Sequence, residues 1–244
     1  MSLSVPRVCL MGHPVAHSRS PMIHGHWLST LGIVGEYRLE DVEPARFPSF
    51  LAHLGAHGYV GGNSDVHGFV TSLDEHARGW DAPGRHALVL GAGGAARAAT
   101  YGLLHRGVAV SLANRTRGRA EHLAEHFGAG VDAHGFDALP QLLPKADLLV
   151  NCTVLGMIGE PRLDVDLALL APHAIVCDAV YVPLETELLA AAARRGHRTV
   201  DGLGMLLHQA GYGFEKWFGV RPKVTRELRE LVEADLHARI RQRA

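Results

Sequence analysis

The sequence predicts an α/β fold with a parallel sheet. Short apolar or β-branched runs alternate along its 244 residues with longer stretches of helical spacing, which is typical of strand–helix–strand units. A glycine-rich turn, VLGAGGAARAA, joins one of these strands to one of these helices. A turn-rich connector, GWDAPGRH at residues 79–86, precedes this series and is the expected domain boundary. We therefore expect two domains, one of them with a Rossmann-like doubly wound sheet.

The expected elements follow in order along the chain. Before the connector, we expect strands at 7–12 and 36–41 and helices at 21–31, 44–55 and 67–77. Ser20 and Pro21 suit the N-cap and the first position of the first helix. After the connector, the expected strands are HALVL, VAVSLANRT, DLLVNCT, AIVCDAVY and RTVDG, and the expected helices are ARAATYGLLHRG, RGRAEHLAEHFG, ELLAAAARRG, 203–218 and 224–243.

Composition and charge exclude several classes of function. Hydrophobic residues make up 47 % and charged residues 20 % of the chain, which is ordinary for a globular protein with a core. The net charge is −1 and Lys and Arg are scattered, so we expect no binding of nucleic acid or of a membrane surface. No apolar run has the length of a membrane span, and the amino end lacks a signal-peptide pattern. A cytoplasmic location is expected.

The spacing of cysteine and histidine argues against a metal site. Cys9, Cys152 and Cys177 each lie in an apolar run and no pair has C-x-x-C spacing, so buried reduced thiols are expected. His13 and His17 are four residues apart, but the proline between them disfavours a helix that would bring them together. No metal is predicted among the cofactors.

The turn after the strand at 86–90 has the spacing of a dinucleotide-binding loop. Gly91 permits the tight turn, Gly93 lets the backbone approach a pyrophosphate, and Ala96 lets helix and strand pack closely. Gly94 and Ala95 open the helix, whose first N–H groups and dipole favour phosphate. The alternative is a glycine-rich turn that binds no ligand.

The end of the next strand favours NADP over NAD. An NAD-preferring fold would carry Asp or Glu there for the ribose hydroxyl. This sequence instead has Asn114, Arg115 and Thr116, followed by Arg119. Two arginines and a hydroxyl would attract a 2′-phosphate that a carboxylate would repel. The alternative is a pair of solvated arginines, which the dipole of a helix start disfavours.

Seven motifs in register give the chain a specific resemblance to the shikimate dehydrogenase family, which includes shikimate/quinate dehydrogenases. They are GHPVAHSRSPMIH, GGNSDVHGF, VLGAGGAARAA, NRT, NCTVLGM, DAVYVPLETELL and DGLGMLLHQA. The resemblance implies NADP-linked reversible reduction of 3-dehydroshikimate to shikimate in aromatic amino-acid biosynthesis, by a monomer or homodimer. It implies a smaller α/β substrate domain from residues 1–78 plus 205–244, and an NADP-binding Rossmann domain at 79–204. A preference for quinate stays open.

The resemblance also implies roles for individual residues. Ser18 and Ser20 match hydroxyls that hold the substrate carboxylate, and Asp65 matches the active-site aspartate beside the substrate hydroxyls. Gln209 matches a substrate-binding glutamine, and Tyr181 matches a tyrosine of the cleft. Positions that match residues near the cofactor are Asn151, Thr153, Gly202 and Met205.

The chain departs from the family pattern just before Asp65. The family carries a segment there that supplies a lysine paired with the aspartate, and roughly thirty to forty residues, about one βαβ unit, are absent from this sequence. The three lysines present, Lys145, Lys216 and Lys223, match none of the family's site positions and are expected on the surface. Either the natural protein carries the segment, which we favour, or the segment is deleted and leaves a protein that binds NADP or shikimate without turnover. The loss would also expose apolar faces and edges of a small sheet.

Overall fold

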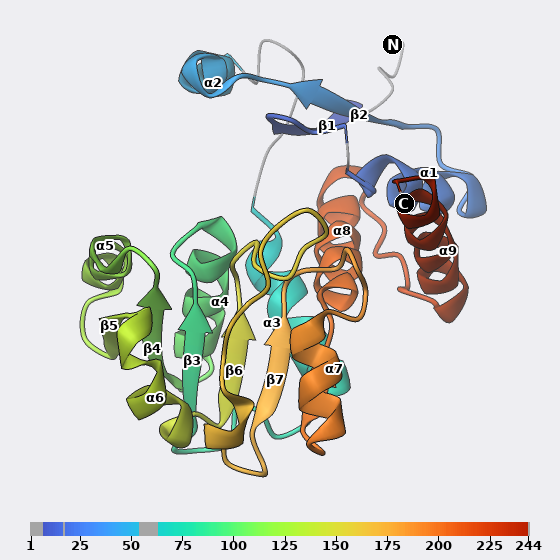
Figure 1. Ribbon diagram of the computed structural model, residues 1–244. Helices are drawn as coiled ribbons and strands as arrows, with labels where there is room; N and C mark the ends of the chain where they lie inside the picture. Colours follow the sequence, from blue (N-terminus) through green and yellow to red (C-terminus); the bar gives the residue numbers. More distant parts are fainter. Residues whose placement is uncertain (1–6, 17, 54–62, 244) are drawn as a thin grey trace. The chain divides into compact units, whose positions relative to one another are not determined.

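The computed structural model describes residues 7–16, 18–53 and 63–243. The chain divides into two compact units, one formed by residues 1–64 with 209–238 and the other by residues 65–208 with 239–244. The helix after Asp65 therefore belongs by its contacts to the second unit, whereas the sequence had grouped it with the amino-terminal segment. Each unit is described by itself below (Figure 1).

The second unit is built on a parallel sheet of six strands in the order β5-β4-β3-β6-β7-β8. The strands are β3 (His86–Leu90), β4 (Ala109–Asn114), β5 (Val131–Gly135), β6 (Leu148–Asn151), β7 (Ile175–Asp178) and β8 (Arg198–Val200). The chain builds outward from β3 to β5 and then returns to β6, so the strand order reverses between β3 and β6. The predicted doubly wound sheet is confirmed, and ligands bind such sheets at the reversal point, beyond the carboxyl ends of the strands.

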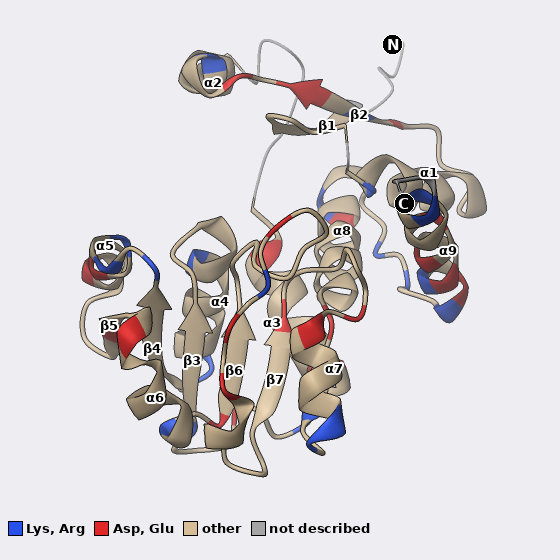
Figure 2. Ribbon diagram, viewed as in Figure 1, with Lys and Arg blue, Asp and Glu red and all other residues tan. Residues whose placement is uncertain are grey.

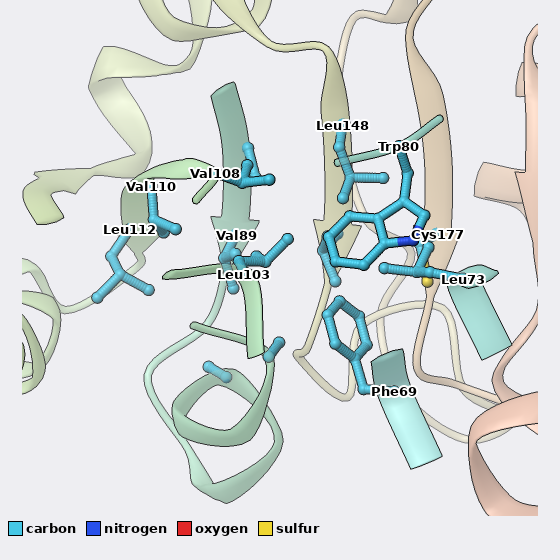
Figure 3. Packing of buried hydrophobic residues seen from close by; sticks show 14 of the residues in the cluster. Phe69, Leu73, Trp80, Val89, Leu103, Val108, Val110, Leu112, Leu148 and Cys177 are labelled. Atoms are coloured by element: carbon cyan, nitrogen blue, oxygen red, sulfur yellow. The ribbon is translucent and has the colours of Figure 1, made fainter. Parts of the chain in front are cut away.

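Helices cover both faces of this sheet. One face carries α3 (Asp65–His76), α4 (Gly94–His105) and α5 (Arg117–Phe127), and the other carries α6 (Leu139–Leu142) and α7 (Glu187–Arg194). Successive residues of a strand point to opposite faces, so Val89 packs into the first core and Leu88 into the second. Figure 3 shows the first core, where the Trp80 ring lies among side chains from α3, α4 and the strands.

The first unit contains a two-stranded parallel sheet, β1 (Arg7–Gly12) and β2 (Glu36–Asp41). The connection between these two strands contains α1 (Ser20–Thr30). The other elements of this unit are α2 (Phe47–Ala52), the later part of α8 (Gly202–Phe218) and most of α9 (Arg226–Arg243). Ile23 and Phe214 are fully buried in it. Short 3₁₀ turns complete the two units: η1 (Pro44–Arg46), η2 (Phe136–Ala138), η3 (Leu143–Lys145) and η4 (Leu167–Leu169).

In the first unit, the described side chains of β2 and α2 are incompletely buried. None of the described side chains of β2 or α2 is fully buried, and Val34 and Leu51 are 76 % and 42 % exposed. A two-stranded sheet is marginal without further strands or packed helices. This is the condition expected of a unit that has lost a strand–helix–strand segment.

Several helix boundaries differ from those expected. Arg19, not Ser20, occupies the N-cap of α1, because Ser20 already has helical geometry and Pro21 lies in the first turn. Residues 54–55 of the helix expected at 44–55 lie outside the described residues. The described part is a 3₁₀ turn followed by a short α-helix, and a proline lies in the first turn of each piece. The helix expected at 67–77 begins at Asp65. Across the described residues, we find no helix with the length and apolar character needed to cross a membrane.

Candidate active site

The turn after β3 brings two strand ends into close contact. Gly91 has a φ of +111°, and its N–H donates to the Ala113 carbonyl at 2.8 Å, which extends the β3–β4 pairing. A Cβ atom on Gly91 would lie 2.9 Å from the carbonyl oxygen of Cys152, at the end of β6. Both the backbone conformation and the close approach therefore require glycine at this position.

The first backbone N–H groups of α4 are not used in helical hydrogen bonds. The first helical hydrogen bond runs from the Arg97 N–H to the Gly93 carbonyl, so the N–H groups of Gly94, Ala95 and Ala96 have no acceptor within the helix. Cβ atoms built on Gly93 and Gly94 would meet no atom within 4 Å, so the space beside them is open. Ala96 is fully buried where the helix meets the sheet. This cradle has the donors and the room that a pyrophosphate needs.

The turn from β4 into α5 is basic (Figure 2). The Asn114 amide donates to the Thr116 carbonyl at 2.8 Å and so closes the turn. Arg115 and Arg119 are exposed, and neither forms a salt bridge within the part of the chain that the structure describes. Arg117, between them, donates to Glu121 at 2.8 Å. Two unengaged guanidinium groups thus stand at the strand end where a 2′-phosphate would lie.

A buried hydrogen-bond network ties together the ends of β6 and β7. The Asn151 amide nitrogen donates to Asp178 Oδ1 at 2.9 Å, and its amide oxygen accepts from the N–H and hydroxyl of Thr153 at 3.0 and 2.7 Å. Asp178 Oδ2 accepts from the Thr186 hydroxyl at 2.7 Å. Burial raises the pKa of Asp178 above its usual value, and the hydrogen bonds from Thr186, Val180 and Asn151 lower it in part.

The start of α8 lies against the loop that follows β7. A Cβ on Gly202 would lie 2.8 Å from the Val180 carbonyl oxygen, so the two turns are in close backbone contact. Asp201 accepts from the N–H groups of Leu203 and Gly204 and caps the helix. Met205 is half-buried against the first core, and Tyr181 is half-buried in the loop after β7.

Asp65 is the first residue of α3, and its side chain is half-buried. α3 is held by close helix contacts: a Cβ on Gly102 of α4 would lie 2.8 Å from Val70, and His208 of α8 pairs with Glu75 at 2.9 Å. Since the connector after α3 enters β3 at the amino edge of the sheet, α3 begins near the carboxyl edge (Figure 1). Asp65 therefore belongs to the same unit and the same edge as the phosphate cradle, and a carboxylate suits a helix N-terminus.

The remaining predicted substrate residues lie in the first unit. The Ser18 hydroxyl accepts from the Ser20 N–H and donates to Ser20 Oγ, both at 3.2 Å. Tyr37 lies against this pair, where burial raises its pKa to about 12 and a hydrogen bond with Ser20 offsets part of the shift. The Gln209 side-chain oxygen is buried and has no hydrogen-bond partner among the residues that the structure describes. An orphaned acceptor of this kind suits a ligand hydroxyl.

Comparison with known proteins identifies the family. The family model described as "Shikimate dehydrogenase substrate binding domain" matches residues 10–77, and that described as "Shikimate / quinate 5-dehydrogenase" matches residues 75–157. A shikimate dehydrogenase (NADP(+)) from Afipia carboxidovorans is 50 % identical over 271 residues, covering 95 % of this chain and 98 % of the relative. The chain belongs to the shikimate dehydrogenase family.

Solved structures of this family have the same fold. The shikimate 5-dehydrogenase of Thermus thermophilus, in complex with NADP(H) and shikimate, is 29 % identical with a TM-score of 0.78, covering 95 % of this chain and 100 % of that one. The quinate dehydrogenase of Corynebacterium glutamicum, in complex with NAD, is 28 % identical with a TM-score of 0.80, covering 93 % of this chain and 98 % of that one.

The alignment to relatives supports the absence of an internal segment. The stretch shared with the Afipia shikimate dehydrogenase spans 271 residues but includes 95 % of this chain, or about 232 of its 244 residues. About 39 positions, the difference between 271 and 232, therefore have no counterpart here. A shikimate dehydrogenase from Rhodopseudomonas palustris, 51 % identical over 271 residues with 95 % of this chain covered, gives the same difference.

No lysine of this family member replaces the one expected from the absent segment. All three lysines are exposed. Lys145 lies in η3 at the amino end of β6, opposite to the edge that carries Asn151. The Lys216 ammonium lies over the Tyr212 ring at 5.3 Å from its centroid. The Lys223 carbonyl accepts from the Trp27 indole N–H at 3.2 Å.

Sequence reasoning missed two groups of this shikimate dehydrogenase fold. Tyr37 was not singled out, although its strand was predicted. Asp178 lies in the motif DAVYVPLETELL, and the resemblance implies no role for it. A carboxylate at the end of a fully apolar strand is a signal of a polar network at a sheet edge, and this signal was present in IVCD.

Proposed function

We propose that this chain is an NADP-dependent shikimate dehydrogenase that interconverts 3-dehydroshikimate and shikimate in the aromatic amino-acid (chorismate) pathway. The observation that carries the proposal is the glycine-rich turn 91–96, with its cradle of N–H groups, at the reversal point of the sheet. The next strand end carries arginines in place of a carboxylate. Membership in a family with NADP(+)-linked relatives supports the same cofactor.

The proposal assigns the first unit to the substrate and the second to the nucleotide. The N–H groups of Gly94, Ala95 and Ala96 would hold the pyrophosphate, and Arg115 and Arg119 would bind the 2′-phosphate, with Asn114 and Thr116 shaping that turn. Asn151 and Thr153 border the nucleotide on the β6 side. Gly202 and Met205 border the nicotinamide. The proposed domain division, 1–78 plus 205–244 for the substrate and 79–204 for the nucleotide, differs from the two contact units at residues 65–78, 205–208 and 239–244.

The substrate roles follow from the chemistry of each side chain. Ser18 and Ser20 donate to the substrate carboxylate, Gln209 accepts from a substrate hydroxyl through its orphaned oxygen, and Tyr181 contacts the substrate. Asp65 accepts the proton of the hydroxyl that is oxidised. NADP, when bound, would accept the hydride from the carbon that bears this hydroxyl. In the reverse direction, the developing alkoxide needs a donor or a cation, which an ionised Asp65 does not provide.

The test is the rate of shikimate-dependent NADPH formation, followed by nicotinamide absorbance. We expect turnover with shikimate and NADP that falls about 10²–10⁴-fold in Asp65→Asn, because the proton acceptor is lost. The matched control is Asp74→Asn on the same helix, whose carboxylate binds Arg106 and Trp80 away from the site. It should retain the wild-type rate. Absence of turnover with shikimate or quinate and either nucleotide would refute the proposal.

A second candidate function is binding of NADP or shikimate without turnover. The observation that favours it is that about 39 positions of the relatives have no counterpart here. The resemblance places the family's lysine in a segment absent before Asp65. This candidate predicts stabilisation by ligand, equal to RT ln(1 + [L]/Kd), in a protein that forms no NADPH. The intact mass of the protein purified from its natural source separates the two: we expect a mass above 26.3 kDa, and a mass of 26.3 kDa would establish a real deletion.

The proposal extends to the setting of the enzyme. We place it in the cytoplasm as a monomer or homodimer that acts on small molecules, in agreement with cysteines that are present as thiols in the described chain. Quinate is an open second substrate, because it shares the carboxylate and ring hydroxyls that the proposed residues recognise.

A further inference from the structure

Asp178 is a buried carboxylate that the proposed hydride transfer does not use. It ends β7, its side chain is buried, and it is 1 % exposed. Oδ1 accepts from the Asn151 amide at 2.9 Å and from the Val180 N–H at 3.0 Å, and Oδ2 accepts from the Thr186 hydroxyl at 2.7 Å. Every one of these partners donates to it, so the carboxylate has a single well-defined orientation.

The first of these partners reaches the phosphate cradle. The Asn151 nitrogen donates to Asp178 and, at 3.1 Å, to the Leu155 carbonyl, and the Asn151 oxygen accepts from the N–H and hydroxyl of Thr153. The Thr153 hydroxyl in turn accepts from the Leu155 N–H at 3.0 Å, which closes the turn 151–155. This turn borders Gly91, since a Cβ on Gly91 would lie 2.9 Å from the Cys152 oxygen and 3.3 Å from Thr153 Cγ2. A rotation of the Asn151 amide would therefore displace atoms that contact the pyrophosphate turn.

The second partner, Val180, contacts the start of α8, which the proposal assigns to the nicotinamide. The Val180 N–H is fixed by Asp178, and the Val180 carbonyl lies against Gly202, the first residue of α8. The third partner, Thr186, caps α7 by accepting from the Leu189 N–H at 3.3 Å and so closes the loop that begins at Asp178. One side chain thus fixes the backbone at two turns of the proposed nucleotide site.

We propose that Asp178 is a positioning residue for the nucleotide, which sets the turn at Asn151–Thr153 beside Gly91 and the turn at Ala179–Val180 beside Gly202. The inference rests on the proposed NADP site and adds a residue that acts through others. It acts by accepting hydrogen bonds, so an amide oxygen in place of Oδ1 can perform most of the same task.

The test is equilibrium titration with NADPH, followed by its fluorescence, which does not depend on turnover. Asp178→Ala should weaken NADPH binding about tenfold to a hundredfold, because it leaves three buried donors without an acceptor. Asp178→Asn should stay within about threefold of wild type, because its oxygen still accepts from Asn151 and Val180 and its nitrogen can donate to the Thr186 hydroxyl. A loss in Asp178→Asn as large as that in Asp178→Ala would overturn the hydrogen-bond account.

The control is Asp147→Ala, which removes a carboxylate at the opposite edge of the same sheet. Asp147 accepts from Arg85 at 2.7 Å and from the His86 N–H at 2.9 Å, so its loss lowers the stability of the unit and should leave the Kd for NADPH unchanged. Equal weakening in Asp147→Ala and Asp178→Ala would reduce the role of Asp178 to general stability and overturn the inference.

A second pair covers the case in which Asp178→Ala does not fold. Thr186→Val is isosteric and removes the donor to Oδ2, and it should weaken NADPH binding about threefold or more. Thr225→Val also removes a helix cap, the bond from the Leu228 N–H at 3.2 Å, and should leave the Kd unchanged. If Thr186→Val binds NADPH as tightly as wild type, the inference about Asp178 is overturned and the proposed function is not affected. Failure of the unchanged chain to bind NADPH would refute the proposed function together with it.

Discussion

Replacement of both Arg115 and Arg119 by alanine is expected to weaken NADP binding and to leave NAD binding unchanged. Both side chains are exposed and have no carboxylate partner among the described residues, so they are available to the 2′-phosphate that distinguishes the two nucleotides. A hydrogen bond to a charged group contributes about 1.5–3 kcal/mol. Because exposed charges are screened by solvent, we take the lower value of about 1.5 kcal/mol for each arginine. Since 1.4 kcal/mol corresponds to a factor of ten, the double variant should lose about a hundredfold in NADP affinity.

The assay is titration with NADP and with NAD at one fixed ionic strength, with the ratio of the two dissociation constants as the readout. Arg117→Ala is the matched control, because Arg117 lies in the same turn and is already engaged by Glu121 at 2.8 Å. It should leave the ratio unchanged. The preference of wild type for NADP should also decline as salt is raised, since the interaction is exposed. Equal losses for NADP and NAD in the double variant, or the same change in Arg117→Ala, would refute the assignment.

Two further predictions concern the phosphate turn and the first unit. Gly93→Ala should keep the thermal stability of wild type and lose NADP binding, since its Cβ meets no protein atom but enters the space assigned to the pyrophosphate; calorimetry and titration on the same sample check both parts. His24 is stacked on Tyr37 with ring centroids 4.0 Å apart, and burial lowers its pKa to about 3, below the 6.5 of an exposed histidine. The unfolded state therefore binds a proton that the folded state does not between pH 6.5 and 3, so stability is lost as pH falls through this window, by at most roughly 5 kcal/mol. His24→Phe should remove this contribution in denaturant titrations at several pH values, and an unchanged pH dependence would contradict it.

The sheet of the second unit was predictable because its strands are buried and strongly apolar. Every residue of β6 and of β7 is buried, and such runs stand out from the surrounding helices. β5 was missed because it is an edge strand, VDAHG, which carries Asp132 and His134 and lacks a continuous apolar run. Helix ends were the least predictable feature, since the caps depend on local geometry that the residue types leave open.

The candidate site was predictable where each residue has its own chemical reason. The glycines of the phosphate turn and the arginines after β4 follow from the spacing of a strand, a turn and a helix. The network around Asp178 joins residues 27 positions apart in the sequence, and only the pairing of β6 with β7 brings them together. The orphaned oxygen of Gln209 is likewise a property of packing, since the residue type alone does not distinguish it from a solvated glutamine.

The most direct test of the proposed function is transfer of an isotopic label. Shikimate that carries deuterium on the carbon of the oxidised hydroxyl is incubated with the 244-residue protein and NADP, and the nucleotide is analysed by mass spectrometry. This detects hydride transfer even at a rate about 10²–10⁴-fold reduced by the absent lysine. We predict NADPH that carries the deuterium, and none in Asp65→Asn over the same time. Unlabelled nucleotide from the unchanged protein, with labelled shikimate and with labelled quinate, would contradict the account.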